Sequence, residues 1–230
     1  MLDRFVALFA PADWLALGVF LVGWIGYSYY ADRASRSERG LRGVTSQLRL
    51  DWAHEMVARE NRITDAALTG NLMTSVSFYA NTTIYIIAGL IAVAGTLDQL
   101  ISFTQDLPFA KQTTKAILEA KLFLMIGIFI FAYFKFTWAL RQYNFLSMLI
   151  GGAPPFDTPE ERRERHARKF ALLSTLAGDE FNRGIRAYYF GFAALAWFVS
   201  AGVFLGVTLL ILMVLYRRDF RSATLEALAR

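Results

Sequence analysis

The sequence predicts an all-α fold, a polytopic membrane helix bundle with four transmembrane helices and cytoplasmic helical extensions, in one domain over residues 1–230. Hydrophobic residues make up 56% of the chain and charged residues 19%, whereas soluble domains average about 25% charged. A spanning helix needs about 20 mostly apolar residues. Four stretches meet this requirement: residues 12–31, 72–97, 122–150 and 187–216.

The first span begins near Trp14 and ends in three tyrosines, Tyr27, Tyr29 and Tyr30. Aromatic residues at both ends of an apolar run are typical of the two membrane interfaces. The run is longer than the 7–15 apolar residues of a signal peptide, and no small-residue cleavage site follows it. We therefore expect a retained first helix.

The polar segment 32–71 connects the first two spans on the cytoplasmic side. Apolar residues recur in it at helical spacing, and no Pro or Gly occurs between Val44 and Thr69. This predicts a helix that runs from about Val44 directly into the second span. That span carries a stripe of polar and small residues, which indicates either a pore-lining face or a face that packs on another helix: Asn71, Thr74, Ser75, Ser77, Asn81, Tyr85, Ala88 and Ala92.

The third span contains two charged residues, Lys135 and Arg141, toward its C-terminal end. Charge within a span marks an ion, anion or proton path. The alternative is a side chain that reaches the interface and pairs with Asp179, Glu180 or a lipid phosphate. The segment 151–186 follows, and Pro159 with two glutamates after it predicts a new helix that leads into the fourth span. Small residues recur through this region and predict close helix packing: Gly184, Ala187, Gly191, Ala194, Gly202 and Gly206.

The distribution of basic residues predicts the orientation, because cytoplasmic segments are rich in Lys and Arg. Fourteen lie in the two polar segments: Arg33, Arg36, Arg39, Arg42, Arg49, Arg59, Arg62, Arg162, Arg163, Arg165, Arg168, Lys169, Arg183 and Arg186. Eight lie on the opposite side: Arg4, Lys111, Lys115, Lys121, Arg217, Arg218, Arg221 and Arg230. We expect a bacterial inner-membrane protein with both termini in the periplasm, although the arginine-rich tail argues against that placement.

The residue inventory argues against catalysis. The chain has no cysteine, and its two histidines, His54 and His166, lie in the polar segments. Haem between membrane helices needs axial ligands at membrane depth, and His54-Glu55 lacks the second histidine of a zinc motif. We expect no cofactor, no metal and no catalytic residue. The net charge of +5 fits arginines beside anionic lipids and does not indicate nucleic-acid binding.

Two stretches together resemble a known family. WAHEMVARENRITDAALTGNLMTSVSFYANTTIYIIAGL covers residues 52–90, and KFALLSTLAGDEFNRGIRAYYFGFAALAWF covers residues 169–198. They resemble the domain-of-unknown-function family numbered five-nine-nine, small integral membrane proteins of bacteria and plants. The resemblance implies a four-span membrane protein and supplies no activity. It also suggests which positions to test first: Arg59, Asn71, Asn81, Glu180, Asn182, Arg183 and Arg186.

Two functions fit these observations. The first is a homo-oligomeric channel- or transporter-like protein in contact with membrane lipids. The alternative is a non-transporting accessory or scaffold subunit of a larger membrane complex, and a lipid-handling enzyme is a weaker third option. The candidate pore, packing or ion-pair positions are Arg59, Arg62, Asn71, Asn81, Lys135, Arg141, Asp179, Glu180, Asn182, Arg183 and Arg186.

Within this set we expect Asp179 or Glu180 to pair with Arg59 or Arg62 and so to fix the two cytoplasmic extensions against each other.

Overall fold

The computed structural model describes residues 9–34, 40–99, 101 and 114–228, and these residues form helices and short connections without strands. The helices are α2 (Pro11–Ala34), α3 (Leu41–Ala58), α4 (Ile63–Gly95), α6 (Lys115–Gly151), α7 (Glu160–Ala196), α8 (Ala201–Phe220) and α9 (Ala223–Leu228). Four helices are long and apolar enough to span a membrane, which confirms the predicted fold class: Pro11–Arg33, Ile63–Gly95, Lys115–Gly151 and Ala201–Leu228. The chain is therefore a multi-pass membrane protein.

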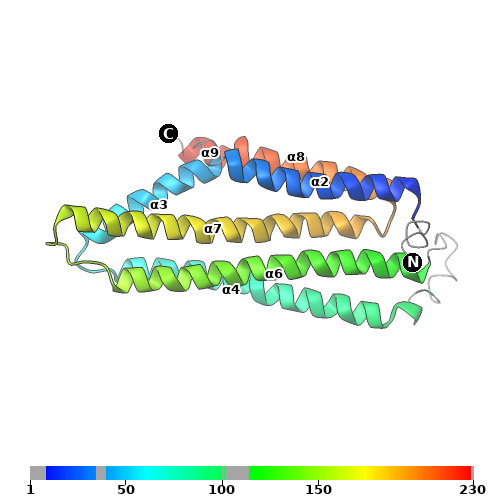
Figure 1. The fold of residues 1–230 in the computed structure, drawn as a ribbon, viewed down its shortest axis with the longest axis horizontal. Coiled ribbons are helices and arrows are strands. Elements are labelled where there is room, and N and C mark those ends of the chain that lie inside the picture. The colour runs from blue at the N-terminus through cyan, green and yellow to red at the C-terminus, as the bar shows by residue number, and fades with distance from the viewer. Residues whose placement is uncertain (1–8, 35–39, 100, 102–113, 229–230) are drawn as a thin grey trace.

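The fourth apolar stretch is divided, so the predicted span 187–216 is wrong as one helix. Helix α7 ends at Ala196 and α8 begins at Ala201. The Ser200 side chain accepts a hydrogen bond from the Val203 backbone N–H at the start of α8, which caps the new helix. The chain reverses here, so α7 and α8 are antiparallel neighbours (Figure 1).

Helix α7 occupies the centre of the bundle. In Figure 1 it runs nearly the full length of the molecule, with α2 and α8 on one side and α4 and α6 on the other. Its extensive contacts with α6 bury small residues such as Ala187 and Ala194. Phe20, Phe136, Phe190 and Phe204 are fully buried between these helices. Helix α7 is not one of the four apolar helices, because its N-terminal half is rich in charged residues, yet it lies between them.

The two described ends of the chain lie far apart along the bundle: α2 begins at the end with the α7–α8 turn, whereas α9 lies beside the end of α2 and the start of α3 (Figure 1). Phe9 stacks on Trp197 at the α7–α8 turn, whereas Tyr30 contacts Phe220 near the start of α3. We call these the Trp197 end and the α3 end. This separation of the described ends does not favour the expected placement of both termini on the periplasmic side, which stays a prediction.

This arrangement places the tail arginines Arg217, Arg218 and Arg221 at the α3 end, together with the described basic residues of both polar segments. The tail therefore no longer argues against a cytoplasmic α3 end. Five basic residues of the sequence count lie outside the described residues: Arg4, Arg36, Arg39, Lys111 and Arg230.

The segment before the second span also differs from the prediction. Instead of one helix from Val44 into the span, α3 ends at Ala58 and α4 begins at Ile63. The Ile63 backbone N–H donates to the Asn61 side chain at 3.0 Å, and Arg59 has an extended backbone (φ −83°, ψ 141°). The resulting corner turns α3 back along α7. Helix α7, in contrast, begins directly after Pro159 as predicted.

Candidate functional site

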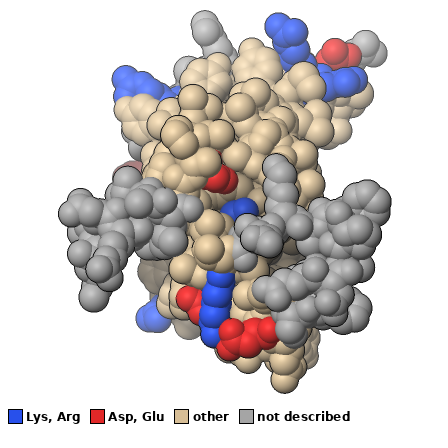
Figure 2. Space-filling view, turned by 90° about the vertical axis from the view of Figure 1, so that its right-hand side faces the viewer, with Lys and Arg blue, Asp and Glu red and all other residues tan. Residues whose placement is uncertain are grey.

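Charged side chains gather in two layers along the bundle. At the Trp197 end, the Trp197 indole N–H donates to Asp13 at 2.7 Å and the Lys121 ammonium donates to the Trp197 carbonyl at 2.8 Å. Figure 2 views this end and shows an acidic and a basic side chain close together on a mostly uncharged surface. Along α2, Asp32 follows Asp13 by nineteen residues, or about 28 Å at the rise of an α-helix. This matches the roughly 30 Å hydrocarbon core of a bilayer.

The layer toward the α3 end centres on Asp32. Its carboxylate accepts from Arg186 Nη2 at 2.7 Å and from Arg183 at 2.7 Å (Nη2) and 2.9 Å (Nε). Arg186 is 5% exposed, so its charge requires compensation inside the protein. Two arginines from α7 thus hold the end of α2.

Glu180 is the second acidic centre of this layer. Its carboxylate pairs with Lys135 of α6 at 2.9 Å and also with Arg183. The sequence analysis singled out Lys135 as a charge within a span, and the structure places it in an ion pair with a buried glutamate of α7. Arg141, the other charge of that span, is exposed and lies over the Phe145 ring at 5.8 Å.

The predicted pairing of Asp179 or Glu180 with Arg59 or Arg62 is wrong. Asp179 pairs with Arg42 of α3. An α3–α7 ion pair therefore exists, but its arginine lies near the start of α3. The reason is that α3 folds back along α7 instead of continuing into α4, so the start of α3, not its end, lies near Asp179. The sequence offered no spacing signal that distinguished Arg42 from its neighbours.

Arg59 and Arg62 stabilise the corner between α3 and α4 instead. Arg59 donates to Asp65 at 3.0 Å, and the Trp52 indole N–H donates to the same carboxylate oxygen at 2.7 Å. Arg62 donates to the backbone carbonyl of Pro154 at 2.7 Å. Asp65 is fully buried, and sequence reasoning missed it because a lone acid at a helix start looks like an ordinary first-turn residue.

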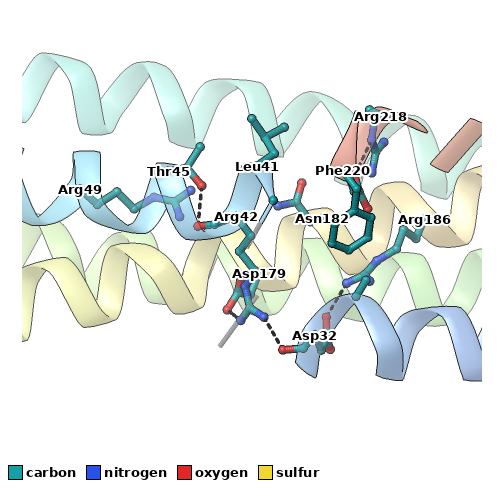
Figure 3. A pocket seen from close by; sticks show the side chains of 13 residues that line it. Asp32, Leu41, Arg42, Thr45, Arg49, Asp179, Asn182, Arg186, Arg218 and Phe220 are labelled. Atoms are coloured by element: carbon teal, nitrogen blue, oxygen red, sulfur yellow. Dashed lines mark hydrogen bonds and ion pairs between the residues drawn. The ribbon is translucent and has the colours of Figure 1, made fainter. Parts of the chain in front are cut away.

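A cavity of about 250 Å³ adjoins the Asp32 cluster between α2, α3, α7 and α8. Figure 3 shows the side chains around it converging from these helices. Its polar lining is mostly charged: Asp32, Arg42, Arg49, Asp179, Asn182, Arg186, Arg218 and Asp219. Of these, only Asp179, Asn182 and Arg186 were candidate residues from the sequence.

The outer face of α4 carries the predicted polar stripe. Asn71, Asn81 and Tyr85 are exposed on the described chain, Tyr85 at 76%. The hydroxyls of Thr74 and Ser75 donate to carbonyls of their own helix at 3.0 Å and 3.1 Å. The polar stripe of α4 therefore lies on the outer surface of the helix bundle.

The glycines of α7 and α8 that the sequence analysis named divide into two groups. A Cβ atom on Gly184 would overlap the Phe136 ring, and one on Gly191 would come within 2.9 Å of Phe129. These glycines therefore allow close contact between α6 and α7. Gly202 and Gly206 are exposed on α8, where a Cβ atom on Gly202 would meet only Ser200 Oγ at 3.9 Å and one on Gly206 would meet nothing within 4 Å.

The cluster consists of arginines and carboxylates, and the Tyr27 hydroxyl donates to Asp219 of the cavity lining at 2.7 Å. No three His, Asp or Glu side chains within the described ranges meet as metal ligands. The ion pairs of this cluster join α2, α3 and α7.

The family model described as "Protein of unknown function, DUF599" matches residues 15–224 of this chain. The chain therefore belongs to the DUF599 family, as the resemblance predicted. No curated protein and no solved structure matches it.

Proposed function

We propose that this member of the DUF599 family is a homo-oligomeric, channel- or transporter-like protein of the bacterial inner membrane, in which the outer faces of α4 from neighbouring copies meet. One observation carries this proposal: the exposed polar stripe on α4, centred on Asn81.

The Asn81 amide has two donors and an acceptor, and it hydrogen-bonds to no described residue. Its neighbour Thr83 hydrogen-bonds Tyr188 of α7 at 2.7 Å, about one turn beyond Arg183 toward the Trp197 end. Asn81 therefore lies between the Asp13 and Asp32 layers, close to the Asp32 layer. At that depth an amide that faces lipid without a hydrogen-bond partner is costly. A second protein surface or water would satisfy it.

The length of α4 supports the same proposal. No charged residue occurs between Asp65 and Asp98, a distance of about 50 Å along a helix. This exceeds the roughly 30 Å of hydrocarbon. Exposed apolar residues such as Leu68 and Phe78 lie in the part nearer the α3 end, and contact with a second copy would cover them.

Between the described helices of one chain, the interior gives no comparable polar path. Its axis is filled by aromatic side chains, among them Phe136, Phe190 and Tyr188. A permeation path would therefore run between copies, lined by α4. The orientation that fits has the arginine-rich α3 end in the cytoplasm.

Cysteine substitution tests this proposal on a chain that has no native cysteine. In membranes, Asn81→Cys and Tyr85→Cys should form disulfide-linked dimers and react with a membrane-impermeant methanethiosulfonate reagent. The matched control is Val22→Cys, which is 73% exposed on α2 and should do neither, because it faces lipid.

The two reactions separate the candidate functions. Cross-linking together with reaction at Asn81 supports a hydrated oligomer. Cross-linking without reaction means that the stripe packs dry, as an accessory or scaffold subunit would. A chain that is monomeric in lipid nanodiscs and unreactive at both positions contradicts the proposal.

A further inference from the structure

The cavity beside Asp32 contains more basic than acidic groups. Four arginines and three aspartates line it. Arg42 pairs with Asp179, Arg186 pairs with Asp32 at 2.7 Å, and Arg218 pairs with Asp219 at 2.9 Å. Each aspartate is thus already bound to at least one arginine, and Asp32 also binds Arg183. The fourth arginine, Arg49, has no carboxylate partner among the described residues.

Arg49 is held in place by packing. Its guanidinium lies directly on the backbone of Gly178 in α7, where any Cβ atom would overlap it. Figure 3 shows its side chain extended toward Thr45 and Arg42. Burial lowers the pKa of Arg49, and the nearby Tyr143 hydroxyl opposes this shift only in part. Because a guanidinium remains charged in proteins, a half-buried one without an anion is unfavourable.

A second donor at the same cavity is also unused. Arg186 is 5% exposed, and its Nε finds no hydrogen-bond partner within the described part of the chain. Its terminal nitrogens are committed to Asp32 and, at 3.5 Å, to the Ser28 carbonyl. Buried polar groups normally have a partner, so this donor indicates that a further acceptor is missing.

We propose that this cavity binds a phosphate group, carried either by a phospholipid headgroup or by a phosphorylated small molecule. Arginine matches phosphate because its planar array of N–H donors bonds to two oxygens at once. The phosphate supplies the negative charge that Arg49 lacks and an acceptor near Arg186. This inference does not depend on oligomerisation through α4, which lies on the opposite side of α7.

The position and size of the cavity fit such a ligand. It adjoins the end of α2 about 28 Å from the Asp13 layer by helix rise, which is the depth at which headgroups meet hydrocarbon. Its volume of about 250 Å³ is below the 300–1,000 Å³ typical of sites for drug-sized ligands. The cavity therefore has room for a phosphate-bearing headgroup and not for a whole drug-sized ligand.

The experiment measures binding of two probes to the purified full-length chain in dodecyl maltoside. Dioleoyl phosphatidylglycerol is followed by native mass spectrometry, and radiolabelled inorganic phosphate is followed by equilibrium dialysis. The test variant is Arg49→Gln. The control is Arg168→Gln, which removes an exposed arginine whose partner is Glu164, one turn earlier on α7.

We expect one saturable site in the unaltered chain, about tenfold weaker binding in Arg49→Gln, since a hydrogen bond to a charged group is lost, and no change in Arg168→Gln. Saturable binding of the lipid alone identifies a headgroup. Saturable binding of inorganic phosphate identifies a soluble phosphorylated ligand.

A second variant keeps the test decisive if Arg49→Gln does not fold. Gly178→Ala retains every charge and displaces the Arg49 guanidinium, so it should also weaken binding. The proposal is overturned if neither probe binds at a single site, if Arg49→Gln and Arg168→Gln behave alike, or if a folded Gly178→Ala binds as the unaltered chain does.

Discussion

Arg186 donates from Nη2 to Asp32 at 2.7 Å and so joins the middle of the central helix α7 to the end of the first spanning helix α2. The two residues are separated by 154 positions in the sequence. Arg183, one turn earlier on α7, binds the same carboxylate at 2.7 Å. This contact fixes how far α2 extends along the bundle, and it forms one wall of the arginine-lined cavity.

Asp32→Ala should destabilise the bundle strongly, because it leaves the buried Arg186 guanidinium without its carboxylate. We expect a loss of about 3 kcal/mol in the free energy of unfolding, the lower end of the range for breaking a buried pair. Titration with sodium dodecyl sulfate in mixed micelles measures this quantity. Glu161→Ala is the control, since its ion pair with Arg165 is exposed and long at 3.8 Å. Equal effects of the two substitutions would contradict the prediction.

Double-mutant cycles should detect the partners that the structure assigns. Arg59→Ala and Asp65→Ala should couple, since their side chains hydrogen-bond at 3.0 Å, and Lys135→Ala and Glu180→Ala should couple across α6 and α7. Removing residues in contact gives interaction energies of about 0.5–3 kcal/mol. Arg59→Ala and Glu180→Ala, in contrast, should be additive. Coupling in that last cycle would show that the corner and the Glu180 cluster act as one network.

Gly191→Leu and Gly202→Leu should differ in their effects on the single chain. A side chain at Gly191 meets the Phe129 ring and should cost about 1–3 kcal/mol through overpacking. Gly202 has open space, so its variant should keep the thermal stability of the unaltered chain. Thermal unfolding followed by tryptophan fluorescence in detergent compares the two. Destabilisation by Gly202→Leu alone would show that its face packs against another protein in the membrane.

Thiol labelling in intact cells should place the two ends of the bundle on opposite sides of the membrane. Cysteines at Gln47 and Glu226 lie at the α3 end and should be protected from an impermeant reagent. A cysteine at Val199, in the α7–α8 turn and 70% exposed, should react. The reverse pattern would invert the orientation, and a difference between Gln47 and Glu226 would contradict the common location of α3 and α9.

Several features of the fold follow from local sequence. The apolar helices are evident because about 20 mostly apolar residues suffice to span the bilayer. In lipid such a segment forms a helix, since a helix satisfies its own backbone hydrogen bonds. Pro159 starts α7 because its fixed φ suits the beginning of a helix. The α3–α4 corner, in contrast, depends on an Asn61 side chain and a buried Asp65, and neither position differs locally from an ordinary helical residue.

The sequence by itself determined that the chain is a helical membrane protein, that its arginines gather in two segments, and which residues carry charge near the spans. The tertiary structure decided where residues 187–216 turn back, because Lys121 and Asp13 bind Trp197 there and Ser200 caps α8. No Gly or Pro marks residues 196–200. That one reversal makes α7 the central helix of the bundle and moves the tail to the α3 end. It also decides the partners of Asp32, Asp179 and Glu180, since ion pairing depends on which helices lie side by side and not on spacing along the chain.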